Sequence, residues 1–167
     1  LNPYPYGYDK DIMAQDLQDK YKDLAAGEEI EDCYHVAGRV MANRNTGMFI
    51  DLVDASGKIQ IFSHKENLSE DDLKTLKSID IGDIVGVTGK VMKTKTGELT
   101  VKCLEYIHLV KALRPLPEKF HGLTDIEERY RRRYVDLIMN EDSKKTAFLR
   151  PRIIRCIQNY MDGLGFV

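Results

Sequence analysis

The stretch "RNTGMFIDLVDASGKIQIF", residues 44–62, decides the fold of this chain. It holds two short runs, 48–54 and 58–62, that are rich in apolar, β-branched and aromatic residues, on either side of a turn at Ser56-Gly57. Such runs, joined by turn residues, predict a β-hairpin. The side chains expected to face the interior are Ile50, Leu52, Ile59 and Ile61. Because successive strand residues point to opposite faces, we expect Phe49 and Gln60 to project outward together.

The pattern of short strands continues on both sides of this hairpin. The expected strands are 33–42, 48–54, 58–63, 83–92 and 98–110. Between the third and the fourth, residues 68–79 ("LSEDDLKTLKSI") predict a helix with Ser69 as its N-cap. Three strands, a helix and two strands is the order of an OB-fold, a five-stranded Greek-key barrel. We therefore expect a mainly β fold with α-helices, in which residues 33–110 form the barrel.

The segments that flank the predicted barrel are helical or proline-rich. Residues 1–32 begin with the arm "NPYPYGY" and continue as an amphipathic surface helix. Its apolar positions are Ile12, Leu17, Tyr21 and Leu24. Residues 111–124 are interpreted as a proline-punctuated linker. Residues 125–167 then predict two helices, the first opened by a capping box of Thr124 and Glu127 and the second stopped by Gly165.

The composition excludes several classes of protein. Net charge is −2, from 25 Lys and Arg against 27 Asp and Glu among 167 residues, so nucleic-acid binding would have to rest on a local patch. The three cysteines are far apart, which disfavours a zinc site or disulfides and favours a reducing, cytoplasmic location. No apolar run approaches the roughly 20 residues of a membrane span, so we expect no membrane association. The start at Leu1 and the apolar end at Val167 suggest a piece of a longer protein.

Three side chains on the hairpin suit the recognition of an unpaired base. A flat ring such as Phe49 can stack on a base, a cation such as Arg44 can hold a phosphate, and an amide such as Gln60 can donate and accept at a base edge. The alternative is that Phe49 belongs to the core, that Gln60 is a solvated strand residue and that Arg44 is ordinary loop charge. Asp51 and Asp54 are interpreted as strand and turn structure.

Positive charge is densest in "RYRRRY", residues 129–134. The arginines there are Arg129, Arg131, Arg132 and Arg133. One interpretation is a solvated helix face paired with Asp125, Glu127 and Glu128. The other is contact with nucleic-acid phosphate or with a partner domain, which also applies to Lys93 and Lys95 in the strand-connecting tip "KTKTG". The sequence shows no P-loop, nucleophile elbow or zinc-protease motif, and no metal-ligand set is predicted.

Several segments in the same order resemble the N-terminal part of the class II lysyl-tRNA synthetases, in the class IIb group. They are "VAGRVMANRNTGMFIDLVDASGKIQIF", "GDIVGVTGKVMKTKTGELTV", "KALRPLPEKFHGLTDIEERYRRRYVDLIMN" and "RPRIIRCIQNYMDGLGFV". The resemblance implies that the barrel is an anticodon-binding domain in which Phe49 stacks on the central anticodon uridine and Gln60 reads its edge. It implies that Arg44 contacts the same region and that Glu98 contacts another anticodon base.

The same resemblance implies a role for the last segment and for the parent protein. The last segment resembles the first half of motif 1, so Ile153, Ile157 and Met161 are candidates for a homodimer interface, and Pro151 is expected to begin or kink its helix. The parent would charge tRNA-Lys with lysine using ATP and Mg²⁺. Its catalytic motifs would lie beyond Val167, so no catalytic residue and no cofactor is expected here, and residues 1–167 alone are expected to be inactive.

A free-standing OB-fold that binds single-stranded nucleic acid without sequence preference is the alternative function. Nonspecific binders of this kind use a basic groove with several stacking rings. The acidic balance of this chain and its single well-placed aromatic residue on the hairpin argue against that alternative.

Overall fold

The computed structural model describes residues 7–117 and 123–166, and the chain divides into two compact units after Pro115. Residues 2–6 of the expected arm and residues 118–122 of the expected linker lie outside the described residues.

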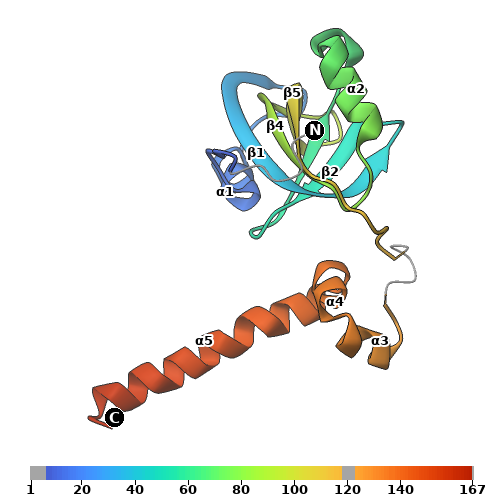
Figure 1. Ribbon diagram of the computed structural model, residues 1–167. Coiled ribbons are helices and arrows are strands. Elements are labelled where there is room, and N and C mark those ends of the chain that lie inside the picture. Colours follow the sequence, from blue (N-terminus) through green and yellow to red (C-terminus); the bar gives the residue numbers. More distant parts are fainter. Residues whose placement is uncertain (1–6, 118–122, 167) are drawn as a thin grey trace. The chain divides into compact units, whose positions relative to one another are not determined.

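The first unit is a closed five-stranded barrel (Figure 1). Its strands are β1 (Glu29–Arg44), β2 (Phe49–Val53), β3 (Lys58–Phe62), β4 (Ile84–Lys93) and β5 (Leu99–Val110). The order around the barrel is β1-β2-β3-β5-β4, and β3 pairs with β5 in parallel while the other pairs are antiparallel. This topology confirms the OB-fold expected from the order of elements.

The barrel interior is filled by aliphatic side chains from all five strands. The four predicted positions of the hairpin are buried: Ile50, Leu52, Ile59 and Ile61. Valines complete this core: Val40, Val85, Val87, Val91 and Val101. Burial of a Val or Ile side chain stabilises the fold by about 1.5–3 kcal/mol, so this alternating pattern supplies much of the driving force for folding.

Strand β1 is longer than predicted, because it begins at Glu29 rather than Cys33. Its additional residues pair with the end of β4, where Glu29 lies opposite Met92. Close approach of β4 and β5 depends on Gly89, which lies at a shift in their register. A Cβ atom there would lie 2.3 Å from the Lys102 carbonyl oxygen, so any larger residue would force the strands apart.

Helices α1 (Ala14–Lys20) and α2 (Glu70–Ser78) lie on different sides of the barrel (Figure 1). Ser69 caps α2 as predicted, since its Oγ accepts a hydrogen bond from the Asp72 backbone N–H at 3.1 Å. The predicted N-terminal helix is shorter than expected, although Leu17 is fully buried against the core.

The N-terminus of α1 is capped from outside the helix. The Asp54 carboxylate accepts hydrogen bonds from the backbone N–H groups of Ala14, Ser56 and Gly57, at 2.9, 2.8 and 3.0 Å. Lys10 Nζ lies 3.3 Å from the same carboxylate. Burial alone would raise the pKa of Asp54, but the hydrogen bonds from the Ser56 hydroxyl and from these backbone N–H groups outweigh it and lower the pKa to about 2. Asp54 therefore joins the β2–β3 turn to α1.

The second unit consists of α3 (Ile126–Arg131), α4 (Arg133–Met139) and α5 (Glu141–Gly163). The predicted single helix over 125–140 is wrong, because the chain leaves helical geometry at Arg132, with φ −110° and ψ 51°. The predicted capping box is also replaced, since Asp125 rather than Thr124 accepts the bond from the Glu128 N–H, at 2.8 Å.

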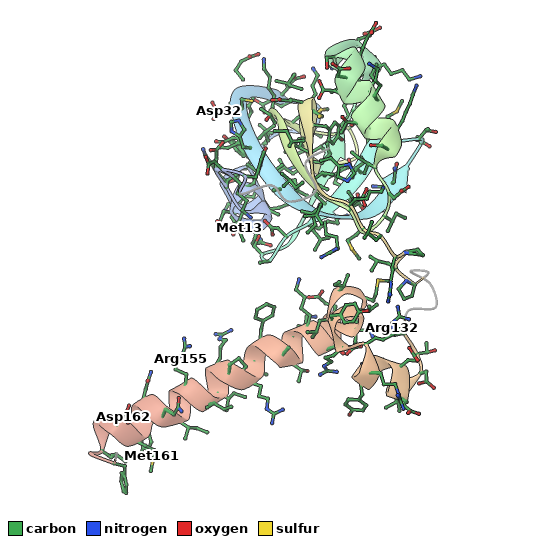
Figure 2. The ribbon with its side chains drawn as sticks, viewed as in Figure 1. Met13, Asp32, Arg132, Arg155, Met161 and Asp162 are labelled. Atoms are coloured by element: carbon green, nitrogen blue, oxygen red, sulfur yellow. The ribbon has the colours of Figure 1, made fainter. Side chains whose placement is uncertain are left out.

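Helix α5 begins at Glu141, earlier than predicted, and runs through Pro151 as one helix. Pro151 therefore does not begin the helix. Gly165, with φ +83°, ends it as expected: the Phe166 N–H returns to the Met161 carbonyl oxygen at 3.1 Å. Arg155 and Met161 project from different sides of α5 (Figure 2), and every side chain from residue 145 to 166 is exposed within this unit.

Within residues 7–117 and 123–166, none of the helices combines the length and the apolar character needed to span a membrane.

Candidate nucleic-acid interface

The outer face of the β2–β3 hairpin brings the candidate residues together. The antiparallel register places Phe49 opposite Phe62, Asp51 opposite Gln60 and Val53 opposite Lys58. On the other side of β2, Arg44 at the end of β1 lies opposite Phe49. The alternation that puts four aliphatic residues inside the barrel therefore leaves a ring, an amide and charged groups on one outer surface.

Two phenylalanines form the apolar part of this surface. The rings of Phe49 and Phe62 have centroids 5.2 Å apart and planes tilted by 39°, and His64 continues the row at 6.1 Å from Phe62. Phe49 and Phe62 are half-buried and lie outside the buried core of the barrel. A partly exposed ring held by a second ring is a ready stacking platform, because little side-chain freedom is left to lose on binding.

The expectation that Gln60 is exposed is wrong. Gln60 lies on the outer face, but only 4% of its surface is accessible. Its Nε2 donates to Glu98 Oε2 at 2.9 Å, and its Oε1 accepts from the hydroxyl of Thr100 at 2.9 Å. The side chains of β5 and of the β4–β5 tip therefore cover an amide that strand alternation alone would leave in solvent.

A chain of ion pairs surrounds this amide. Arg44 Nη2 lies 2.7 Å from Asp51 Oδ1, and Lys58 Nζ lies 3.6 Å from Asp51 Oδ2 and 3.2 Å from Glu98 Oε1. Arg44, Lys58 and Glu98 keep 51%, 50% and 38% of their side-chain surface exposed, whereas Asp51 keeps only 9%. The buried Asp51 carboxylate thus pairs with Arg44 and Lys58, while half of each cationic side chain stays accessible. Accessible cations held in this way are suited to contacts with phosphate.

The turn between β1 and β2 is conformationally unusual. Asn45 and Thr46 have φ of +52° and +55°, a left-handed conformation that is uncommon for a β-branched residue such as Thr46. Gly47 follows with φ +93°, and a Cβ atom there would lie 2.8 Å from Leu76 Cγ of α2. Because α2 packs directly on the turn, Arg44 and Phe49 emerge from a firmly held segment.

A pocket of about 280 Å³ lies between this turn and α2. The residues that line it are Asn45, Thr46, Met48, Ser63, Lys65, Leu73, Leu76 and Lys77. Two of its lining residues, Met48 and Ser63, are the chain neighbours of Phe49 and Phe62. Among the described residues, no acid forms an ion pair with Lys65 or Lys77.

The tip between β4 and β5 places Glu98 at the edge of the same face. The tip is closed by backbone bonds between Thr94 and Glu98 and between Gly97 and Thr94, at 3.0 and 2.9 Å. Lys95 is exposed at its end, whereas Lys93 turns back and donates to the Lys22 carbonyl oxygen at 2.9 Å. Of the two predicted tip lysines, only Lys95 projects freely into solvent.

The arginines of residues 129–133 are paired inside the second unit. Arg131 and Arg132 form the expected i,i+4 pairs with Glu127 and Glu128, at 2.6 and 3.8 Å. Arg129 and Arg133 instead both reach Asp136, each at 2.8 Å. This pairing favours the ion-pair interpretation.

Asp136 is the polar centre of the second unit. It is fully buried, and it accepts hydrogen bonds from arginines of both α3 and α4 and from Asn140. Burial alone would raise the pKa of Asp136, but the bonds from Asn140, Arg129 and Ser143 lower it to about 2. The break at Arg132 places arginines of two helices around one carboxylate.

Sequence reasoning missed three residues of the β2–β3 face, Asp51, Lys58 and Phe62, and one residue of β5, Thr100. Lys58 and Phe62 follow from period-2 alternation around Gln60, so the signal for them was present. Asp51 was interpreted as strand structure, although it shares the face of Phe49. Thr100 could not be found from local pattern, because its place beside Gln60 depends on the parallel pairing of β3 with β5.

The barrel has the topology of an OB-fold, and residues 34–109 match the family model described as "OB-fold nucleic acid binding domain". Over nearly all of its length the chain is also similar to curated lysine–tRNA ligases. It is 47% identical to the one of Sinorhizobium medicae and 49% identical to the one of Agrobacterium fabrum, over 98% of the chain in both cases. It is 49% identical to the one of Mannheimia succiniciproducens over 99% of the chain. The chain spans about a third of the length of these relatives, 33–34%.

Proposed function

We propose that this chain recognises the anticodon loop of a tRNA as part of a lysine–tRNA ligase. The observation that carries the proposal is the outer face of the β2–β3 hairpin, where a ring pair adjoins an amide, a carboxylate and two cations. The family match of the barrel and the names of its relatives support it.

The chemical roles follow from what each group can offer. Phe49, supported by Phe62, would stack on one unpaired base. Gln60 and Glu98 would read the edge of a base, because together they offer a donor and an acceptor. Arg44 would contact the backbone next to that base.

The pocket beside α2 extends the proposed surface. Lys65 and Lys77 line it and would attract a phosphate of a flanking nucleotide. Because the net charge of the chain is −2, these local cations rather than the whole protein would attract the RNA.

The parent enzyme would charge tRNA-Lys with lysine, using ATP and Mg²⁺, in the cytoplasm. Within residues 7–117 and 123–166, the structure shows no group of three or more His, Cys, Asp or Glu side chains that could hold a metal ion. The class II assignment and the inactivity of residues 1–167 alone are part of this proposal.

A homodimer through α5 is the proposed assembly of the parent. Ile153, Ile157 and Met161 lie on one side of the helix by their spacing and remain 50%, 57% and 38% exposed within this unit. Exposed aliphatic side chains at helical spacing are typical of a face that another helix covers.

Binding of RNA hairpins to the chain tests the proposal. A uridine-centred anticodon stem-loop should bind more tightly than a hairpin of the same stem with a scrambled loop, as measured by isothermal titration calorimetry. A free-standing, nonspecific OB-fold, the alternative function, would bind both hairpins and an unstructured oligonucleotide with equal affinity. That outcome would exclude anticodon recognition.

A further inference from the structure

Thr100 lies behind Gln60 on the outer face of the barrel and is fully buried. It pairs with Gln60 across the parallel β3–β5 ladder and with Met92 across β4–β5. Its hydroxyl donates to Gln60 Oε1 at 2.9 Å, and the Glu98 backbone oxygen is a more distant alternative acceptor at 3.2 Å. A buried hydroxyl with these partners acts on the amide in front of it and has no access to solvent or RNA.

Two groups with opposite hydrogen-bonding character hold the amide of Gln60. An ionised carboxylate only accepts hydrogen bonds, so the atom of Gln60 that faces Glu98 is the nitrogen. The oxygen consequently faces Thr100, which can donate to it. The amide therefore turns its N–H₂ group toward half-exposed Glu98 and its carbonyl oxygen toward buried Thr100. We call the edge of the outer face formed by the Gln60 N–H₂ group and the Glu98 carboxylate the rim.

This orientation decides which base edge matches the rim. At the rim, the Gln60 donor lies beside the carboxylate acceptor of Glu98. Uracil offers the complementary order, because a carbonyl oxygen lies next to its N3–H group. Cytosine offers the reverse order at the same two positions, with an amino group next to a bare N3.

We propose that Thr100 is a positioning residue for base selectivity: its buried hydroxyl fixes the Gln60 amide so that the rim favours uracil over cytosine. The inference rests on the proposed recognition of an anticodon loop and adds to it a residue that never touches the RNA. Glu98 alone cannot fix the orientation of the Gln60 amide while a base is bound, because the base must share or displace the contact between Glu98 and Gln60. Thr100 is the partner that remains.

The variant Thr100→Val tests the role of the hydroxyl, since valine keeps the shape of the side chain. Affinities are measured for two hairpins that differ only in uridine or cytidine at the central loop position. We expect the uridine preference to fall about tenfold in Thr100→Val, the size of one lost hydrogen bond, and to return in Thr100→Ser. Thr88→Val, the same exchange on β4 away from Gln60, should leave the preference unchanged.

A second substitution tests whether Thr100 acts through Gln60. On a Gln60→Leu background, Thr100→Val should cause no further change in the preference, because there is no amide left to position. A full additional effect on that background would overturn the proposal. So would an unchanged preference in Thr100→Val alone.

Nuclear magnetic resonance of the unmodified chain tests the orientation without any variant. The side-chain amide protons of Gln60 should show stronger contacts to the Glu98 side chain than to the Thr100 methyl group. The opposite order of intensities, which a flipped amide would give, would overturn the proposal even if Thr100→Val fails to fold. If the unmodified chain itself prefers neither hairpin, the proposed function fails together with this inference. If the unmodified chain prefers the uridine hairpin but the predictions for Thr100 fail, only the positioning role is refuted.

Discussion

Replacement of Phe49 by alanine separates a stacking role from a structural one. Phe49 is half-buried, lies outside the core and contacts Phe62 with ring centroids 5.2 Å apart. If Phe49 stacks on a base, Phe49→Ala should weaken binding of the uridine-centred hairpin by roughly 1–3 kcal/mol. This corresponds to a loss of about five- to 150-fold in affinity.

The cost to folding should be smaller than that of a core substitution on the same strand. Removal of Phe49 forfeits its pairing with Phe62, worth about 0.5–1.5 kcal/mol, together with part of its buried surface. Leu52 is two strand positions past Ile50 and is 1% exposed, so Leu52→Ala should cost about 2–5 kcal/mol. Phe49→Ala should therefore stay folded and should lower the free energy of unfolding by less than Leu52→Ala.

Calorimetry measures the affinity for the hairpin, and urea unfolding monitored by circular dichroism measures the free energy of unfolding, both on the same samples. Phe49→Leu is a matched control, because it keeps an apolar side chain but has no flat ring, and it should bind nearly as weakly as Phe49→Ala. The reasoning would be refuted if Phe49→Ala were unfolded at room temperature, since Phe49 would then be a core residue. Unchanged affinity in a folded variant would refute it as well.

Three further predictions concern single side chains. Gln60→Ala should relax discrimination between uridine and cytidine at the central position, measured as the ratio of two hairpin affinities; an unchanged ratio would remove its reading role. Asp54→Asn should lower the free energy of unfolding at neutral pH, and the deficit relative to the unmodified chain should shrink between about pH 3.8 and about pH 2 in urea titrations. The reason is that the pKa of Asp54 is lowered from 3.8 to about 2 in the folded chain, so its contribution is complete above 3.8 and lost below that range; a deficit that stayed constant to pH 2 would contradict this. Pro151→Ala should strengthen α5 by up to about 3 kcal/mol, because the Ala147 carbonyl gains a donor. Slower amide exchange in α5, absent in the neighbouring Arg150→Ala, would support it, and equal exchange would count against it.

Local pattern was sufficient for the barrel, because the signals there are short-range. The i, i+2 spacing of Ile50 and Leu52, and of Ile59 and Ile61, placed the hairpin and its inner face correctly. The cap at Ser69 and the stop at Gly165 were also predicted, since each acts within a few residues of chain.

The second unit shows where local pattern failed. The helical periodicity of the sequence continues across Arg132, but the helix ends there and a second one begins. Arg129 and Arg133 both form ion pairs with buried Asp136. Asp54 likewise caps α1 from a turn 40 positions away in the chain. In both cases a buried carboxylate accepts hydrogen bonds from separate elements, and the partner in the other element cannot be inferred from helical spacing.

The amino-acid sequence by itself determined that the chain forms an OB-fold barrel and that Phe49 and Gln60 share its outer face. The reason is that strand periodicity decides which side of the sheet a residue occupies. Only the tertiary structure decided that Gln60 is covered and that its amide is held between Thr100 and Glu98. These contacts join residues 38 and 40 positions apart, and they exist because β3 closes the barrel by pairing in parallel with β5.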